Sequence, residues 1–427
     1  MFSLKQAVER QALIIVCEMR RIYTADIDRG GIRMNFSKKS WKLTALAVGT
    51  MLMGSVFAGC GGSQSAGGSS DGSEIVIGSN FELTGNQANY GNAANDGLKL
   101  AIKEANDAGG INGKKLKLVT ADTKSEAAES VNSATKLISE DKAKILVGPA
   151  VTANVIAESA VATENKVPVI APAATSPDVT VENGKVRPFI FRSCFIDPQQ
   201  GTVMAEFAIK ELHAKTAVIY TDSSSDYSKS LGKVFKEKFE AAGGTVLMEE
   251  SFLAKDQDFK ATLTKLKTAN ADVMFIPAYY EEVGKIVKQG RELGITSVML
   301  GTDGWDDPKV VDIAGAEALN NTYFSTHYFE KDQEVQGFIE AFKKEYGREP
   351  NVFAALGYDA GKMLIDALKR GGEDPDKIRE ALEQTKDLQV GTGKITMDPN
   401  HNPIKSAVIL EMKNGMKEMK AKIAPEG

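Results

Sequence analysis

The sequence predicts an α/β protein made of two similar, doubly wound lobes. From Glu74 onward, short apolar β-branched runs alternate with amphipathic helical stretches almost without interruption. A second run of the same kind begins near Pro198. Two such runs of similar length predict two lobes, with right-handed crossovers inside each. The length agrees, because 427 residues are too many for one ordinary hydrophobic core.

The elements of the first series follow from spacing. Apolar residues recur at helical spacing across residues 92–108, and Gly109-Gly110 ends that helix. The first series is predicted to hold strands 75–78, 116–119, 145–147 and 167–170, with helices 92–108, 125–140 and 155–163. The second is predicted to hold helices 201–212, 227–242, 259–268 and 281–293, with strands 217–220, 246–248, 273–276 and 298–300. The remainder reads as helices 333–346, 353–370 and 376–385, then strands 393–396 and 407–410.

The stretch from Lys144 to Thr180 predicts a binding site. Two parallel strands joined by one helix place two loops side by side at their carboxyl ends, where open α/β sheets bind ligands. One loop carries Thr152 at a helix start, with free N–H groups and the positive end of the helix dipole. The other carries Ala173, Ala174 and Thr175, whose small side chains let a ligand approach the backbone. This pair of loops suits a small anion such as a carboxylate.

The net charge and the few histidines and cysteines narrow the range of functions that this sequence can have. Residues 1–59 hold nine Lys/Arg against four Asp/Glu, so the rest carries 43 against 53, a formal charge of −10. A body that acidic argues against nucleic acid as a partner. His213, His327 and His401 lack metal-ligand spacing and are expected to be surface or core residues. Cys194 is the one cysteine of the body, so no internal disulfide is possible there, and it is expected to be a small buried hydrophobe. No cofactor or metal is expected.

The N-terminus reads as a lipoprotein leader. A basic segment and an apolar stretch too short for a comfortable membrane span make up residues 34–59. The stretch ends Val56-Phe57-Ala58-Gly59-Cys60, which resembles a bacterial lipobox with Cys60 as the lipidated residue. A plain secretory signal with an incidental cysteine is the alternative. Residues 60–73 read as a flexible Gly/Ser-rich linker, and residues 1–33 as an over-called start before Met34.

From Glu74 to about Lys420 the chain resembles the leucine/isoleucine/valine-binding proteins of ABC importers. No single motif is specific, but their order and spacing are. They are Leu83-Thr84-Gly85 with Tyr90-Gly91, Ala108-Gly109-Gly110-Ile111-Asn112-Gly113, Val147-Gly148-Pro149, Pro172-Ala173-Ala174-Thr175, Asp226-Tyr227-Ser228, Tyr279-Tyr280-Glu281 and Gly301-Thr302-Asp303-Gly304. The resemblance implies a type I periplasmic-binding-protein fold, with Rossmann-like lobes joined by a three-crossing hinge. It places lobe I at 74–196 and 327–405, and lobe II at 197–326 and 406–427.

The resemblance also implies a ligand site for an amino acid. Thr152 and the N–H of Thr175 would bind the α-carboxylate. The Ala173 carbonyl and the Thr175 hydroxyl would accept hydrogen bonds from the α-ammonium, and Asp303 would supply its counter-charge. The implied set is completed by Ala174 beside the ligand and by the cleft-lining Tyr90, Tyr227 and Tyr279.

These residue types suit a zwitterion. Removing two opposite charges from water is costly unless each meets hydrogen-bonding partners. Apolar and aromatic walls then contribute roughly 0.8 kcal/mol per buried methylene. Ordinary structural roles remain open for each residue: Thr152 and Thr175 as a helix cap and a turn residue, Asp303 as a turn former, and Tyr227 as the start of its helix.

The function these observations predict is a lipid-anchored solute-binding protein that delivers a branched-chain or related amino acid to an ABC permease. It is expected to be a monomer outside the cytoplasm, held to the membrane by its lipid alone. A sensor with the same fold, or a binder of another small carboxylate or amide, is the alternative. An enzyme is disfavoured, because HExxH and Walker motifs are lacking and no GxGxxG motif follows the first strand. Which amino acid binds is left open.

Overall fold

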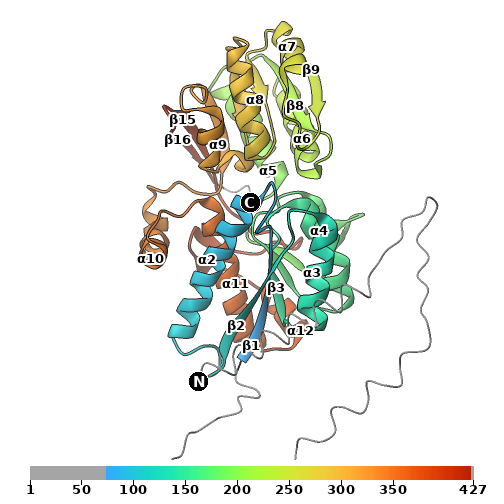
Figure 1. The fold of residues 1–427 in the computed structure, drawn as a ribbon, viewed down its shortest axis with the longest axis vertical. Helices are drawn as coiled ribbons and strands as arrows, with labels where there is room; N and C mark the ends of the chain where they lie inside the picture. The colour runs from blue at the N-terminus through green and yellow to red at the C-terminus, as the bar shows by residue number, and fades with distance from the viewer. Residues whose placement is uncertain (1–73, 425–427) are drawn as a thin grey trace, which may run out of the picture. The chain divides into compact units, whose positions relative to one another are not determined.

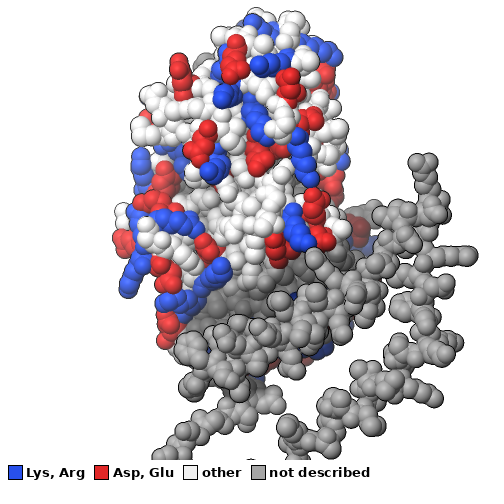
Figure 2. Space-filling view, in the orientation of Figure 1, with Lys and Arg blue, Asp and Glu red and all other residues white. Residues whose placement is uncertain are grey.

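The computed structural model describes residues 74–424. The predicted over-called start, leader, lipidated Cys60 and linker therefore lie outside the described residues. Within 74–424 no helix is both long enough and apolar enough to span a membrane. On the face viewed in Figure 2, Lys and Arg are interspersed with Asp and Glu.

The first sheet is wholly parallel, in the order β2-β1-β3-β4-β7. Its central strands are buried on both faces, as their apolar composition predicts. The strands are β1 (Glu74–Phe81), β2 (Lys115–Asp122), β3 (Ile145–Val147), β4 (Val169–Ala171) and β7 (Ile190–Arg192).

Helices pack on both faces of this sheet. In Figure 1, α2 and α11 lie together on one side of β1 to β3, and α3 with α4 on the other. Helix α2 begins at Ala88, four residues before the predicted Asn92. The Gly/Asn-rich run before Asn92 has low helix propensity, so its sequence did not predict a helix. Burial of the Tyr90 side chain holds this run in the helix. The helices of this lobe are α2 (Ala88–Asp107), α3 (Ala127–Ser139), α4 (Thr152–Glu164), α10 (Gln336–Tyr346), α11 (Val352–Gly371) and α12 (Pro375–Glu383).

The second sheet has the order β16-β15-β12-β11-β10-β8-β9, and only β15 and β16 run antiparallel to their neighbours. Its strands are β8 (Thr216–Asp222), β9 (Thr245–Phe252), β10 (Val273–Phe275), β11 (Val298–Gly301), β12 (Thr322–Thr326), β15 (Ala407–Lys413) and β16 (Met416–Ile423). Its helices are α5 (Asp197–Lys210), α6 (Asp226–Ala241), α7 (Lys260–Thr268), α8 (Tyr280–Glu292) and α9 (Lys309–Ala314).

The chain passes between the two lobes after β7, after β12 and before β15. The predicted lobe boundaries follow the same order along the chain, and their residue-level limits stay a prediction. Short elements fill the connections: the 3-10 turns η1 (Pro177–Val179), η2 (Asp303–Trp305) and η3 (Gln333–Val335), and the hairpins β5 (Val181–Glu182) with β6 (Lys185–Val186) and β13 (Leu388–Val390) with β14 (Gly393–Ile395).

Glycines allow α2 and α11 to touch backbone to backbone. A Cβ on Gly357 would overlap the carbonyl oxygen of Ala94, and one on Gly97 would overlap that of Ala354. We expect Gly357→Ala to lower the free energy of unfolding by about 3 kcal/mol, because the helices must move apart. Chemical denaturation measures this change. The control is Gly337→Ala in α10, where the added methyl meets nothing within 4 Å; an equal loss there would contradict the explanation.

Candidate functional site

The loops after β3 and β4 lie side by side, as their parallel pairing requires. Helix α4 begins at Thr152, and the Thr152 hydroxyl accepts a hydrogen bond from the N–H of Ser176 at 3.5 Å. Ala173, Ala174 and Thr175 are all buried in the other loop. Among residues 74–424 the Thr175 hydroxyl has no hydrogen-bond partner. A buried hydroxyl in that state is available to a ligand.

A buried carboxylate that the sequence analysis missed holds the first loop. Glu82 accepts hydrogen bonds from the N–H groups of Ala150 and Val151, at 3.0 and 3.3 Å, and from the Asn154 amide at 2.8 Å. Burial raises the pKa of Glu82, although these donors oppose the change. Glu82 directly follows the first strand, and a charged residue there looks like an ordinary loop residue in the sequence.

A small cavity lies between the loops of the two sheets. Five of the eight predicted ligand residues line it: Tyr90, Ala173, Tyr227, Tyr279 and Asp303. Thr152, Ala174 and Thr175 are buried in the adjoining loops without lining it. The remaining wall residues are Ala150, Val151, Gly304 and Phe353.

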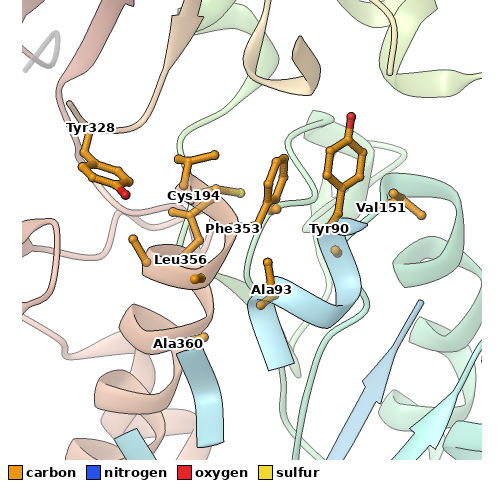
Figure 3. Packing of buried hydrophobic residues seen from close by; sticks show 14 of the residues in the cluster. Tyr90, Ala93, Val151, Cys194, Tyr328, Phe353, Leu356 and Ala360 are labelled. Carbon is orange, nitrogen blue, oxygen red and sulfur yellow. The ribbon is translucent and has the colours of Figure 1, made fainter. Parts of the chain in front are cut away.

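Aromatic rings form much of the cavity wall. Tyr90 packs against Phe353 with ring centroids 4.2 Å apart, and Figure 3 shows the two rings side by side, with Val151 beyond Tyr90. From the second lobe, Tyr227 stacks on Tyr279 at 4.9 Å and an interplanar angle of 7°. The Tyr90 and Tyr279 rings meet edge to face at 5.8 Å. Such a wall favours an apolar group on the ligand.

The Tyr90 hydroxyl joins the two lobes. It donates to the Gly304 carbonyl at 2.5 Å and accepts from the N–H of Tyr280 at 2.9 Å. Nearby, the Tyr280 hydroxyl donates to the Asn86 carbonyl at 2.8 Å. Both tyrosines are buried, and Tyr90 and Gly304 line the cavity.

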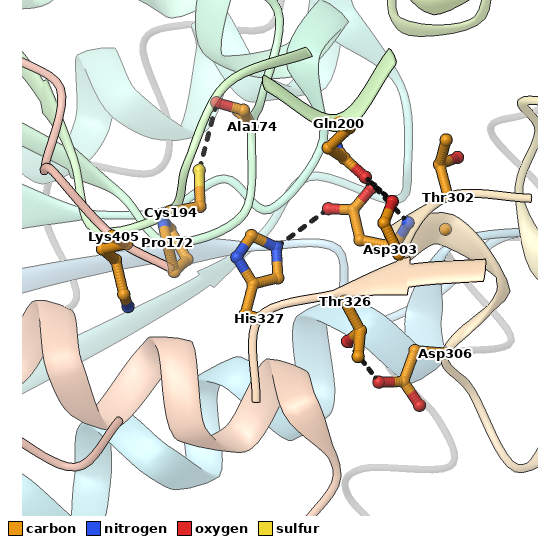
Figure 4. Close-up of polar contacts among 12 residues, drawn as sticks. Pro172, Ala174, Cys194, Gln200, Thr302, Asp303, Asp306, Thr326, His327 and Lys405 are labelled. Atoms are coloured by element: carbon orange, nitrogen blue, oxygen red, sulfur yellow. Dashed lines mark hydrogen bonds and ion pairs between the residues drawn. The ribbon is translucent and has the colours of Figure 1, made fainter. Parts of the chain in front are cut away.

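Asp303 lies in the cavity wall with protein partners on both carboxylate oxygens. Its Oδ1 accepts from the Tyr227 hydroxyl at 2.7 Å and from the Gln200 amide at 3.0 Å. Its Oδ2 lies 3.0 Å from Nε2 of His327. Figure 4 shows Asp303 between Gln200 and His327. Sequence reasoning missed Gln200, and it treated His327 only as a surface or core residue.

Asp197, the first residue of α5, is a second buried carboxylate that sequence reasoning missed. It is fully buried, and neither of its oxygens meets hydrogen-bond geometry with any residue in 74–424. Burial raises its pKa to about 8, with the nearby Asp303 adding to the rise and the Thr175 hydroxyl opposing it. Burial together with Asp197 and Asp303 also raises the pKa of Tyr279. The Asp197 carboxyl group therefore lies close to Thr175 of the first lobe and to Asp303 and Tyr279 of the second.

The remaining predictions concern cysteine and metal. Cys194 is fully buried, which confirms its expected place in the core. Its thiol donates to the Ala174 carbonyl at 3.4 Å, so it supports the loop that carries Thr175. Within the described part of the chain, no three His, Cys, Asp or Glu side chains cluster as metal ligands would.

Two doubly wound lobes with a buried polar and aromatic cavity between them define a two-lobed ligand-binding protein. A family model described as "Periplasmic binding protein" matches residues 74–417. The chain belongs to the leucine/isoleucine/valine-binding proteins of this family, the solute-binding proteins of ABC importers with the type I fold. The predicted family and fold class are therefore confirmed.

Relatives and solved structures are similar over most of the chain. It is 30% identical over 328 residues to the Leu/Ile/Val-binding protein homolog 3 of Brucella melitensis, covering 76% of this chain and 87% of that protein. It is similar to the leucine-binding protein LivK of Thermotoga maritima, with 37% identity, a TM-score of 0.77, and coverage of 82% and 99%. The Streptococcus pneumoniae substrate-binding protein LivJ, solved with isoleucine, has 37% identity, a TM-score of 0.77, and coverage of 83% and 100%.

Proposed function

We propose that this protein is the lipid-anchored solute-binding subunit of an ABC importer and binds a branched-chain amino acid between its lobes. The observation that carries the proposal is a buried polar pair, the Thr175 hydroxyl and the Asp197 carboxyl group, whose oxygens meet hydrogen-bond geometry with no residue in 74–424. Groups of this kind are costly to bury unless a ligand completes their hydrogen bonds.

In this proposal each end of the amino acid has its own partners. The helix-start Thr152 and the N–H of Thr175 bind the α-carboxylate. The Ala173 carbonyl and the Thr175 hydroxyl accept from the α-ammonium. Asp303 supplies the counter-charge, with Asp197 as a second acceptor on the same side.

The rest of the cavity receives the aliphatic side chain. Tyr90, Tyr227 and Tyr279 cover it, and Ala174 leaves room for the loop backbone to approach. Because the partners come from both lobes, binding favours the closed arrangement. Cys60 carries the lipid, the permease is the partner, the protein is monomeric outside the cytoplasm, and it catalyses no reaction. LivJ, its relative solved with isoleucine, supports this ligand class.

Thermal shift of the purified protein against the twenty amino acids and a panel of small carboxylates tests the proposal. A ligand at 100 times its dissociation constant adds about 2.7 kcal/mol of stability, which is readily seen as a higher melting temperature. Leucine, isoleucine or valine is expected to give the largest shift. Flat curves for every amino acid would contradict the proposal, and a shift with a carboxylate alone would favour the alternative ligand class.

A further inference from the structure

His327 lies where two lobe-to-lobe connections meet. It directly follows β12, on the connection that returns the chain to the first lobe. Its ring is buried and stacks on Phe195 with centroids 3.7 Å apart and an interplanar angle of 21°. Phe195 follows β7, on the first connection between the lobes. The imidazole is therefore held by both connections rather than by one lobe.

The ring makes one polar contact with the binding cavity. Nε2 of His327 lies 3.0 Å from Oδ2 of Asp303, and both side chains are nearly inaccessible, at 0% and 4% exposure. An ionised carboxylate can only accept, so Nε2 must carry the hydrogen. Burial lowers the pKa of His327 more than Asp303 raises it, which favours a neutral ring. Nδ1 has no partner in the described region.

This contact fixes one half of the Asp303 carboxylate. Tyr227 and Gln200 both donate hydrogen bonds to Oδ1. Among residues 74–424, His327 is the side chain within hydrogen-bond distance of Oδ2. Without the imidazole, Oδ2 would lose its donor and the carboxylate could turn about its side-chain torsions. Tyr227 and Gln200 would still hold Oδ1, but Oδ2 would no longer be held at one place relative to the cavity.

We propose that His327 is a positioning residue that holds the Asp303 carboxylate in the orientation that receives the ammonium group of an amino-acid ligand. This inference rests on the proposed function. Since the ring lies on the connections between the lobes, His327 also links the orientation of Asp303 to the geometry of the hinge. The charges of Asp306 and Lys405 also influence the pKa of His327. Neither residue donates a hydrogen bond to Oδ2 of Asp303 in the described part of the chain.

His401 provides a matched control. It is also buried, stacks on Phe191 at 4.0 Å and 12°, and has its pKa lowered by burial. Its ring bonds the Ile190 carbonyl at 2.9 Å rather than a residue of the cavity. A purely structural role for buried histidines would make the two positions respond alike.

The test is calorimetric titration of the full protein with L-leucine for His327→Leu, His327→Gln and the same pair of changes at His401. His327→Leu is expected to weaken binding about tenfold or more, because it removes a donor to a charged acceptor. His327→Gln, whose amide can still donate, is expected to remain within about threefold of the unchanged protein. Both His401 variants are expected to stay within that same range.

Two results would overturn the proposal: unchanged affinity in His327→Leu, or an equal loss in His327→Gln. Should the leucine variant not fold, ¹⁵N NMR of histidine-labelled protein decides instead, since the sequence has only three histidines. The His327 signal, assigned by its loss in His327→Gln, must show a hydrogen on Nε2, and an Nε2 without hydrogen refutes the assignment. If the unchanged protein bound none of leucine, isoleucine and valine, that result would instead refute the proposed function, and the NMR result would stand separately.

Discussion

Asp303→Asn is expected to weaken L-leucine binding by about 100-fold or more, the cost of leaving a buried ammonium without its counter-charge. Asparagine keeps the size of the side chain and can still accept from Tyr227 or Gln200. The change therefore removes charge with little change in packing. Calorimetric titration measures the affinity, and melting curves verify the fold.

Asp306→Asn is the matched control for that substitution. Asp306 is equally buried, but its carboxylate bonds Thr326 at 2.5 Å and Lys417 at 2.9 Å, away from the cavity wall. We expect Asp306→Asn to lower stability and to leave affinity within about threefold. Retained affinity in Asp303→Asn, or an equal loss in both variants, would remove Asp303 from the ligand site.

Asp197→Asn is expected to stabilise the ligand-free protein and to weaken ligand binding. The pKa of Asp197 is about 8 in the folded protein, against about 3.9 for an unfolded aspartate. At pH values between about 3.9 and about 8, the Asp197 carboxyl group keeps its proton in the folded protein and loses it in the unfolded chain. The contribution of this group to stability is therefore greatest below pH 4 and falls as pH rises toward 8. An amide does not ionise, so the variant should be more stable at pH 8 by about 1–3 kcal/mol.

Ligand affinity should rise over the pH range in which the contribution of Asp197 to stability falls. An ammonium group stabilises the ionised carboxylate, so the affinity of the unchanged protein for L-leucine should rise between pH 6 and pH 8. The variant should lack that rise and bind about tenfold more weakly at pH 8. Melting curves and titrations at both pH values measure the two effects. Lower stability of the ligand-free variant at pH 8, or an unchanged pH profile of binding, would contradict this role for Asp197.

Local pattern predicted the features that depend on neighbouring residues. Alternating apolar runs fixed the parallel strands, and the strand–helix–strand unit placed Thr152 beside the loop that carries Thr175. Tyr90 was predicted to cover the cleft, and it lines the cavity. That its hydroxyl would also join the lobes could not be predicted, since Gly304 is 214 residues away along the chain.

Gln200 and Glu82 were missed for the same reason, because their partners lie far away along the chain. Gln200 and Asp303 are 103 residues apart, and Glu82 and Ala150 are 68 apart. A glutamine within a helix or a glutamate after a strand has no local pattern that marks it as buried. Asp197 was missed for a different reason, because an aspartate before a proline is a common helix start. Only the assembled lobes show that its carboxylate is enclosed.

The interleaved chain path has a consequence for how this protein acquires its structure. Strand β15 lies between β12 and β16 in the second sheet, and α11 packs on α2, which precedes it by more than two hundred residues. The first lobe lacks α11 and α12 until Glu383 has been synthesised, and the second lacks β15 and β16 until Ile423 has been synthesised. Folding must therefore wait for nearly the whole polypeptide, and its many distant pairings predict slow maturation compared with a helical bundle. Fragments that stop before Ala407 should fail to yield a complete second lobe.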